Sequence, residues 1–180
     1  QVTMKQILLL ICAFLWTMIA TAQTSNAVEF ILSKEVSLSY TGFNSIWQAG
    51  IESGNHQIYA GPKISLNYTY VPSKPVGGWQ LGYRYYYLTG ENVKSFAAID
   101  YQAFLLKPYN PTGISTKKRN SISELSLSFG VQRKIWKGLN ATGSIGIGRY
   151  KENYHDLIMS KQHNYTGYNG MVKIGVLYEL

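Results

Sequence analysis

Residues 168–180 read Tyr-Asn-Gly-Met-Val-Lys-Ile-Gly-Val-Leu-Tyr-Glu-Leu. Every even position in this stretch carries an apolar, aromatic or small side chain, whereas Asn169, Lys173 and Glu179 fall on odd positions. Successive side chains of a β-strand point to opposite faces, so this period of two predicts a strand with one apolar and one polar face.

The same alternation recurs upstream through most of the chain. A clear example is Leu125, Leu127 and Phe129, which alternate with Ser126 and Ser128. The pattern predicts eight strands, separated by turn-like segments. They cover about 33–41, 45–53, 57–70, 79–88, 96–106, 121–135, 140–150 and 168–180. Segment 24–32 fits either an extension of the first strand or a short helix.

The composition of the chain excludes several other classes of protein. The 180 residues are 46% hydrophobic but only 14% charged, and they include 15 Tyr and 17 Gly. Such an apolar chain with few prolines is not disordered. The single cysteine, Cys12, cannot form an intrachain disulfide scaffold.

The N-terminal segment has the features of an export signal. Residues 1–3 resemble an upstream extension before Met4, and Lys5 precedes an apolar run at 7–20 that is followed by Thr-Ala-Gln. This arrangement predicts a signal peptide over residues 1–22, cleaved after Ala22, and a barrel domain over 23–180. A transmembrane anchor is the alternative, although the run is shorter than the roughly 20 residues that span a bilayer.

One-sided alternation fits a soluble barrel or sandwich as well as a membrane barrel. Aromatic residues near strand ends, such as Trp47, Trp79 and Tyr168, favour the membrane barrel, because aromatic girdles lie at the two membrane surfaces. The connections agree, since the two longest expected loops fall at the same end. One end holds 42–44, 71–78, 107–120 and 151–167, and the other holds 54–55, 89–95 and 136–139.

With this pattern the chain resembles the small eight-stranded outer-membrane β-barrel proteins of Gram-negative bacteria, the OmpA-like and OmpX-like "porin family". The resemblance rests on the apolar N-terminal run, the eight alternating segments and the closing strand that ends at Leu180. It implies an all-β, eight-stranded antiparallel up-and-down transmembrane barrel in the cell outer membrane. It also implies contact with outer-membrane lipid and lipopolysaccharide.

The sequence contains no recognisable catalytic or metal-binding motif, and no cofactor is expected. His56, His155 and His163 show no metal-ligand spacing. Some eight-stranded barrels are lipid A-modifying enzymes, but His163 lacks the nearby serine expected of the deacylases. We therefore expect a non-enzymatic barrel with a structural or interaction role. A narrow transport channel is the main alternative, and a lipid A-modifying enzyme is a further one.

The lumen is expected to be plugged by charged side chains, because eight strands enclose just enough room for side chains. Inward charges are expected at eight positions, namely Glu52, Lys63, Arg84, Asp100, Glu124, Lys134, Lys173 and Glu179. If Leu88 lies opposite Phe96, Arg84 faces Asp100, and Lys63 on the adjacent strand could share the carboxylate. Independent hydration of these side chains is the alternative.

Two further expectations concern strand register. Gly54-Asn55 has the sequence of a two-residue hairpin turn, which places Glu52 opposite Gln57 and Gln48 opposite Gly61. Pro62 cannot donate a ladder hydrogen bond, so a bulge or local break is expected there.

The candidate contact residues lie in the two longest loops. They are Lys117, Lys118 and Arg119, together with Tyr109, Tyr154 and Tyr165. The basic cluster fits either a solvated loop tip or contact with lipid phosphates. Another envelope protein is a further candidate partner, whereas nucleic acid is not expected for an exported chain.

Overall fold

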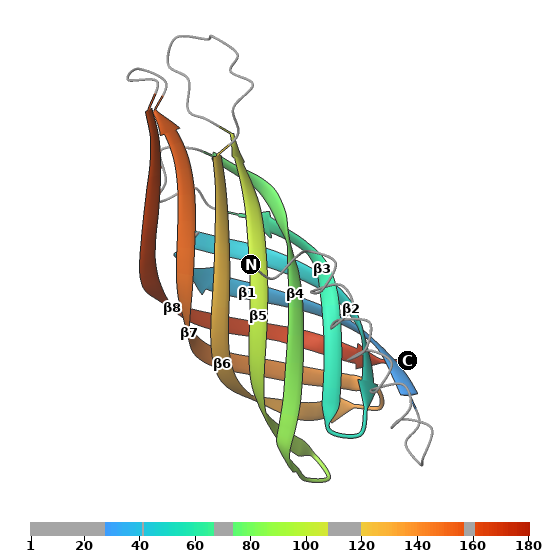
Figure 1. The fold of residues 1–180 in the computed structure, drawn as a ribbon. Coiled ribbons are helices and arrows are strands. Elements are labelled where there is room, and N and C mark those ends of the chain that lie inside the picture. Colours follow the sequence, from blue (N-terminus) through green and yellow to red (C-terminus); the bar gives the residue numbers. More distant parts are fainter. Residues whose placement is uncertain (1–27, 41, 67–73, 108–119, 157–160) are drawn as a thin grey trace, which may run out of the picture.

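The computed structural model describes residues 28–40, 42–66, 74–107, 120–156 and 161–180. They form a closed antiparallel barrel in which each strand pairs with its sequence neighbour and the last strand pairs with the first (Figure 1). The strands are β1 (Val28–Ser39), β2 (Gly42–Ser53), β3 (His56–Ser65), β4 (Lys74–Thr89), β5 (Val93–Lys107), β6 (Asn120–Trp136), β7 (Leu139–Asp156) and β8 (Lys161–Glu179). The expected fold is therefore confirmed.

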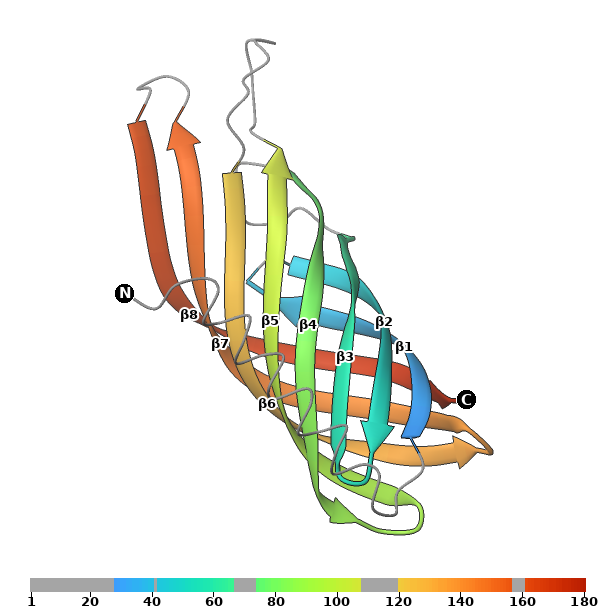
Figure 2. The ribbon, with the colours of Figure 1, turned by 45° about the vertical axis from the view of Figure 1, so that its right-hand side comes forward.

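The two ends of the barrel differ in their connections. Short turns at 54–55, 90–92 and 137–138 join strands at one end, called the turn end here. The connections after β1, β3, β5 and β7 lie at the other end, the loop end, and span 40–41, 66–73, 108–119 and 157–160, so all but the first are longer than the turns. The C-terminus lies beside the start of β1 at the turn end, where the Leu180 amide donates to the Phe30 carbonyl at 2.9 Å (Figure 2).

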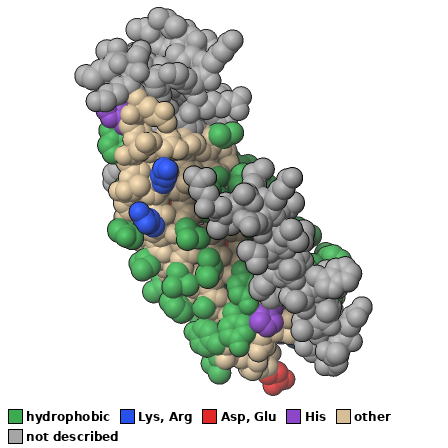
Figure 3. All heavy atoms as spheres, in the orientation of Figure 1, with side chains coloured by type: hydrophobic (Ala, Val, Ile, Leu, Met, Phe, Trp, Pro, Cys, Tyr) green, Lys and Arg blue, Asp and Glu red, His purple; other side chains and the backbone are tan. Residues whose placement is uncertain are grey.

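The barrel is apolar outside and polar inside. Phe129 and Ile145, expected to point outward, are 54% and 68% exposed, whereas the lumen-facing Ser126 is 2% exposed. Figure 3 shows apolar side chains gathered on the wall of the barrel that faces the viewer, with cationic side chains above them. An outer wall of this kind suits hydrocarbon rather than water. Among the described residues, no helix is long and apolar enough to cross a membrane.

Strands β7 and β8 are longer than the sequence pattern indicated. The expected loop 151–167 is largely a continuation of this hairpin, with Lys151 paired to Thr166 and Asp156 to Lys161. Outward residues of this extension, such as Lys151, Asn164 and Thr166, are polar, so the strands continue without hydrophobic alternation. Of segment 24–32, residues 28–32 are strand, and 24–27 lie outside the described residues.

The β2–β3 hairpin has the expected register. Ser53 pairs with His56 and Glu52 with Gln57, and Gly54 adopts a φ of 58°. The ladder has no pairs between Ala49↔Ala60 and Ile46↔Lys63. This interruption lies where Pro62 was expected to break the ladder.

The β4–β5 register differs from the expected one. Leu88 pairs with Ser95 rather than Phe96, and a bulge at Tyr87 then brings Tyr86 opposite Phe96. The turn is also tighter than expected, because the Gly90 amide donates to the Val93 carbonyl at 2.8 Å. Beyond the bulge, β4 and β5 are therefore shifted by two residues relative to each other from the register in which Arg84 would face Asp100.

Candidate functional site

The lumen holds the largest collection of buried polar side chains in the described structure. Alternate residues of every strand point inward, so each strand contributes to it. Members that are at most 5% exposed include Glu35, Gln48, Glu52, Gln57, Lys63, Gln80, Arg84, Asp100, Gln102, Glu124 and Lys173. Of the expected inward charges, Lys134 is exposed instead, beside a bulge between Lys134 and Trp136.

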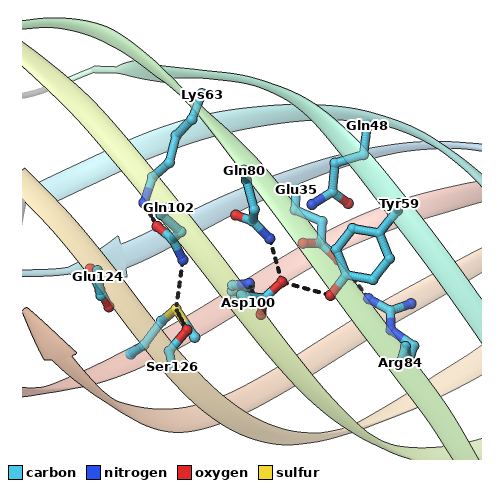
Figure 4. Close-up of polar contacts among 12 residues, drawn as sticks. Glu35, Gln48, Tyr59, Lys63, Gln80, Arg84, Asp100, Gln102, Glu124 and Ser126 are labelled. Atoms are coloured by element: carbon cyan, nitrogen blue, oxygen red, sulfur yellow. Dashed lines mark hydrogen bonds and ion pairs between the residues drawn. The ribbon is translucent and has the colours of Figure 1, made fainter. Parts of the chain in front are cut away.

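Asp100 is the centre of the lumen network (Figure 4). Its Oδ2 lies 2.6 Å from the Lys173 ammonium, and Oδ1 accepts hydrogen bonds from Tyr59 Oη at 2.7 Å and Gln80 Nε2 at 2.6 Å. The Asp100 residue is 0% exposed and Lys173 4% exposed. A carboxylate desolvated to this extent requires a cation and further donors, and β3, β4 and β8 supply them.

A second ion pair lies beside the first. Arg84 Nη2 is 3.1 Å from Glu35 Oε1, and its guanidinium carbon lies 4.1 Å from the Phe96 ring centroid. The expected Arg84–Asp100 pair is therefore wrong. The β4–β5 bulge places Arg84 opposite Ala98 and Asp100 opposite Gly82, so each finds its partner across the lumen.

Lys63 does not share the Asp100 carboxylate either. Its ammonium donates to Gln102 Oε1 and lies 4.5 Å from the Phe104 ring centroid. Glu124 accepts a hydrogen bond from Asn169 Nδ2 at 3.1 Å. The lumen charges are thus held by several small groups of polar and aromatic side chains.

Apolar side chains form two buried clusters in the lumen, one toward each end. Near the turn end, Tyr86, Phe96 and Ala98 form a buried cluster. Near the loop end, Phe104 and Ile122 form another, against which Tyr40 and Tyr150 pack. The rings of Tyr40 and Tyr150 stack at 3.9 Å.

The loop-contact candidates are placed only in part. Tyr109, Lys117, Lys118 and Arg119 lie outside the described residues. Tyr165, on β8, is 52% exposed and stacks on His163. The backbone of Tyr154, on β7, pairs with that of His163.

Several residues of the network were not singled out in the sequence. Glu35 alternates with Lys34 and Val36, which lie on the outward face of β1, so its phase alone predicts an inward carboxylate. Tyr59 and Gln80 could be found in the same way. Their convergence on one carboxylate depends on the curvature of the closed sheet and has no sequence signal. No group of three or more His, Cys, Asp or Glu residues in the described structure could hold a metal ion.

Comparison with known proteins gives similarity at the level of fold. No protein-family model matches the chain, and no curated protein sequence matches it. A major outer membrane protein from Thermus thermophilus matches with a TM-score of 0.50 and 13% identity, over 86% of this chain and 100% of that one. Neisserial surface protein A (NspA) matches with a TM-score of 0.48 and 13% identity, over 87% and 99%.

A de novo designed transmembrane β-barrel matches with a TM-score of 0.49 and 10% identity, over 84% of this chain and 95% of that one. At these identities the similarity shows the fold alone, and of these three structures only the Thermus protein reaches a TM-score of 0.5. The fold is that of an eight-stranded transmembrane β-barrel, as the sequence resemblance implied.

Proposed function

We propose that this protein is a closed, non-enzymatic barrel of the outer membrane with a structural or interaction role. The observation that carries this proposal is the filling of the lumen. Lys63, Gln80, Asp100 and Gln102 are each 0% exposed, so no water-sized space adjoins these polar side chains. A diffusion pore needs the opposite, a lumen in which polar side chains are exposed to solvent.

The arrangement of charges supports the same function. Lys173–Asp100 and Arg84–Glu35 are ion pairs that bridge the lumen, since each joins strands that are not neighbours in the barrel. At the turn end, the Lys94 ammonium lies 2.7 Å from Glu52 and 3.7 Å from Glu179. Such contacts brace the wall and neutralise these lumen charges in pairs.

The outer wall supports an outer-membrane location with contact to lipopolysaccharide. Ile145 and Ile147 are followed on the same face of β7 by Arg149 and Lys151, which are exposed. Cations directly beyond an apolar wall match the height at which lipid phosphates lie. The extended β7–β8 hairpin, with Tyr165 and His163, adds surface for another envelope protein.

Recording current across planar bilayers tests the closed lumen. Barrels inserted from detergent are expected to leave the bilayer at its baseline conductance, while a diffusion porin inserted in parallel gives discrete steps. Folding of the inserted sample is checked by its gel mobility without heating. Reproducible steps from the folded barrel would instead establish the narrow-channel alternative. A mass change in lipid A after expression would establish an enzyme.

A further inference from the structure

A cation, Lys34, interrupts the apolar outer wall of the described barrel near the middle of β1, whereas the outward Arg133 lies close to the 137–138 turn. Lys34 lies on the outward face of β1, between Leu32 and Val36, and is exposed. Its partners in the ladders are Val176 on β8 and Trp47 on β2. Trp47 lies in the middle of β2, not near a strand end as the sequence indicated. These four apolar neighbours are themselves 40–50% exposed, so Lys34 lies within the lipid-facing surface.

Lys34 is also too deep to reach either membrane surface. The apolar row continues to Phe30 on one side and Leu38 on the other. Four residues of strand span roughly 13 Å, which a strand tilt of about 35–45° reduces to about 10 Å of depth. The lysine side chain reaches only about 6 Å, from five bonds of ordinary length. A cation at such a depth is costly, and an ionisable group there marks a functional site.

The ammonium has no negative partner in the described structure. It lies 4.4 Å from the centroid of the Trp47 ring, a cation–π contact that holds it against the wall. No described carboxylate is within salt-bridge distance of it. The described acidic residues of the strands occupy the lumen-facing phase, so a second copy of this chain could not supply a carboxylate from its described outer wall.

A groove with a volume of about 430 Å³ adjoins Lys34. It is lined by Trp47, Pro62, Val176 and Tyr178, with Ala49 and Ala60 at the interrupted part of the β2–β3 ladder. The small side chains leave a hollow between the large aromatic ones. A cation and an apolar recess of this size can receive an acidic side chain together with its apolar neighbours.

We propose that Lys34 and this groove dock a membrane-embedded segment of a second envelope protein, which places a carboxylate against the ammonium. The inference rests on the interaction role proposed above and moves the contact from the loops to the wall. A lipid phosphate does not fit, because phosphates lie at the membrane surface rather than beside Lys34. The ion pair removes the penalty of the isolated cation, so docking is favoured within the apolar layer.

The test uses the folded barrel in phosphatidylcholine vesicles and a synthetic probe. The probe is a membrane-spanning leucine peptide with one central Glu and a dansyl group. The control peptide is identical except that it carries Gln in place of Glu. Energy transfer from tryptophan to dansyl reports association. The Glu peptide should reach half-maximal transfer at a concentration at least tenfold lower than the Gln peptide.

Variants separate the cation from the groove. Lys34→Met should remove the tenfold preference, and Lys34→Arg should retain it. A double variant, Lys34→Met with Ile145→Lys, moves the cation to an outward position on β7 that is not part of the groove. Equal binding by this double variant would mean that charge alone attracts the peptide, which overturns the docking site, as would full binding by Lys34→Met.

A second readout needs no peptide. In vesicles without the probe, Lys34→Met should raise the midpoint of urea unfolding, because an unpartnered cation has been removed from the lipid-facing wall. A lower midpoint would show that Lys34 stabilises the isolated barrel, which contradicts the proposal. If the docking tests fail, the proposal of a closed lumen is unaffected. If conductance steps are recorded, the closed lumen is rejected and the docking result still holds.

Discussion

Asp100 illustrates how individual residues stabilise this barrel. Its carboxylate is fully buried and is paired with Lys173 from the far side of the lumen. Removing one member of a buried ion pair leaves the other charge buried without a partner and costs roughly 3–5 kcal/mol. Asp100→Ala should therefore lower the free energy of unfolding by that order, and Lys173→Met with Asp100→Leu should recover much of the loss. Urea unfolding in vesicles measures both.

A double-mutant cycle identifies the true partner. Lys173 and Asp100 should show a clear coupling energy, whereas Arg84 and Asp100 should be closer to additive because Arg84 pairs with Glu35. A larger coupling energy for Arg84 and Asp100 than for Lys173 and Asp100 would contradict the observed β4–β5 register.

Residues of the outer wall face lipid, whereas Asp100 and its partners face the lumen. Arginine at Phe129 or Ile145 should cost roughly 2–4 kcal/mol, because it places a charge among lipid-facing side chains. Tyr168 is 81% exposed and lies opposite Arg149, beyond the apolar wall, so arginine there should cost about 0–1 kcal/mol. Equal costs at the three positions, measured by urea unfolding in vesicles, would argue against a lipid-facing wall.

At the scale of the element, the β2–β3 hairpin makes register directly measurable. Ala49 pairs with Ala60, and both point outward. In a chain with Cys12→Ser, Ala49→Cys with Ala60→Cys should form a disulfide, because directly opposed residues have Cβ atoms about 4.5–5.5 Å apart. Gel mobility with and without reductant detects the crosslink.

The matched control shifts one partner by a single residue. Ala49→Cys with Tyr59→Cys places the two thiols on opposite faces of the sheet and should remain reduced. Preferential oxidation of this shifted pair is the result that would reject the register. Gly61 is unsuitable for trapping, because a Cβ there would overlap the Trp47 carbonyl.

Elements differ in how well the sequence predicted them. The Gly54 turn was predictable, because a two-residue loop with glycine first restricts the register to one choice. The β4–β5 register was not, because the bulge at Tyr87 changes the pairing without changing the alternation on either side. The loop-end parts of β7 and β8 were missed because strands outside the hydrocarbon layer need no apolar face.

At the scale of the whole molecule, closure makes the barrel resistant to denaturation. All eight strands are paired on both sides over part of their length, so the ring has no free edge there. Folded protein in dodecyl sulfate should run faster on a gel without heating than after boiling. It should also fractionate with outer membranes at high salt. Recovery as a soluble periplasmic monomer would contradict the membrane barrel.

Local sequence determined the strand number, the two faces of each strand and the position of the β2–β3 turn. These properties depend on the alternation of side chains and on backbone preferences within a few residues, so they can be predicted from short stretches of sequence. Only the tertiary structure decided that Asp100 pairs with Lys173, that Arg84 pairs with Glu35, and that Lys34 lies beside a groove. The two ion pairs depend on which strands closure brings face to face, and the groove depends on closure placing β8 beside β1; both are properties of the whole ring.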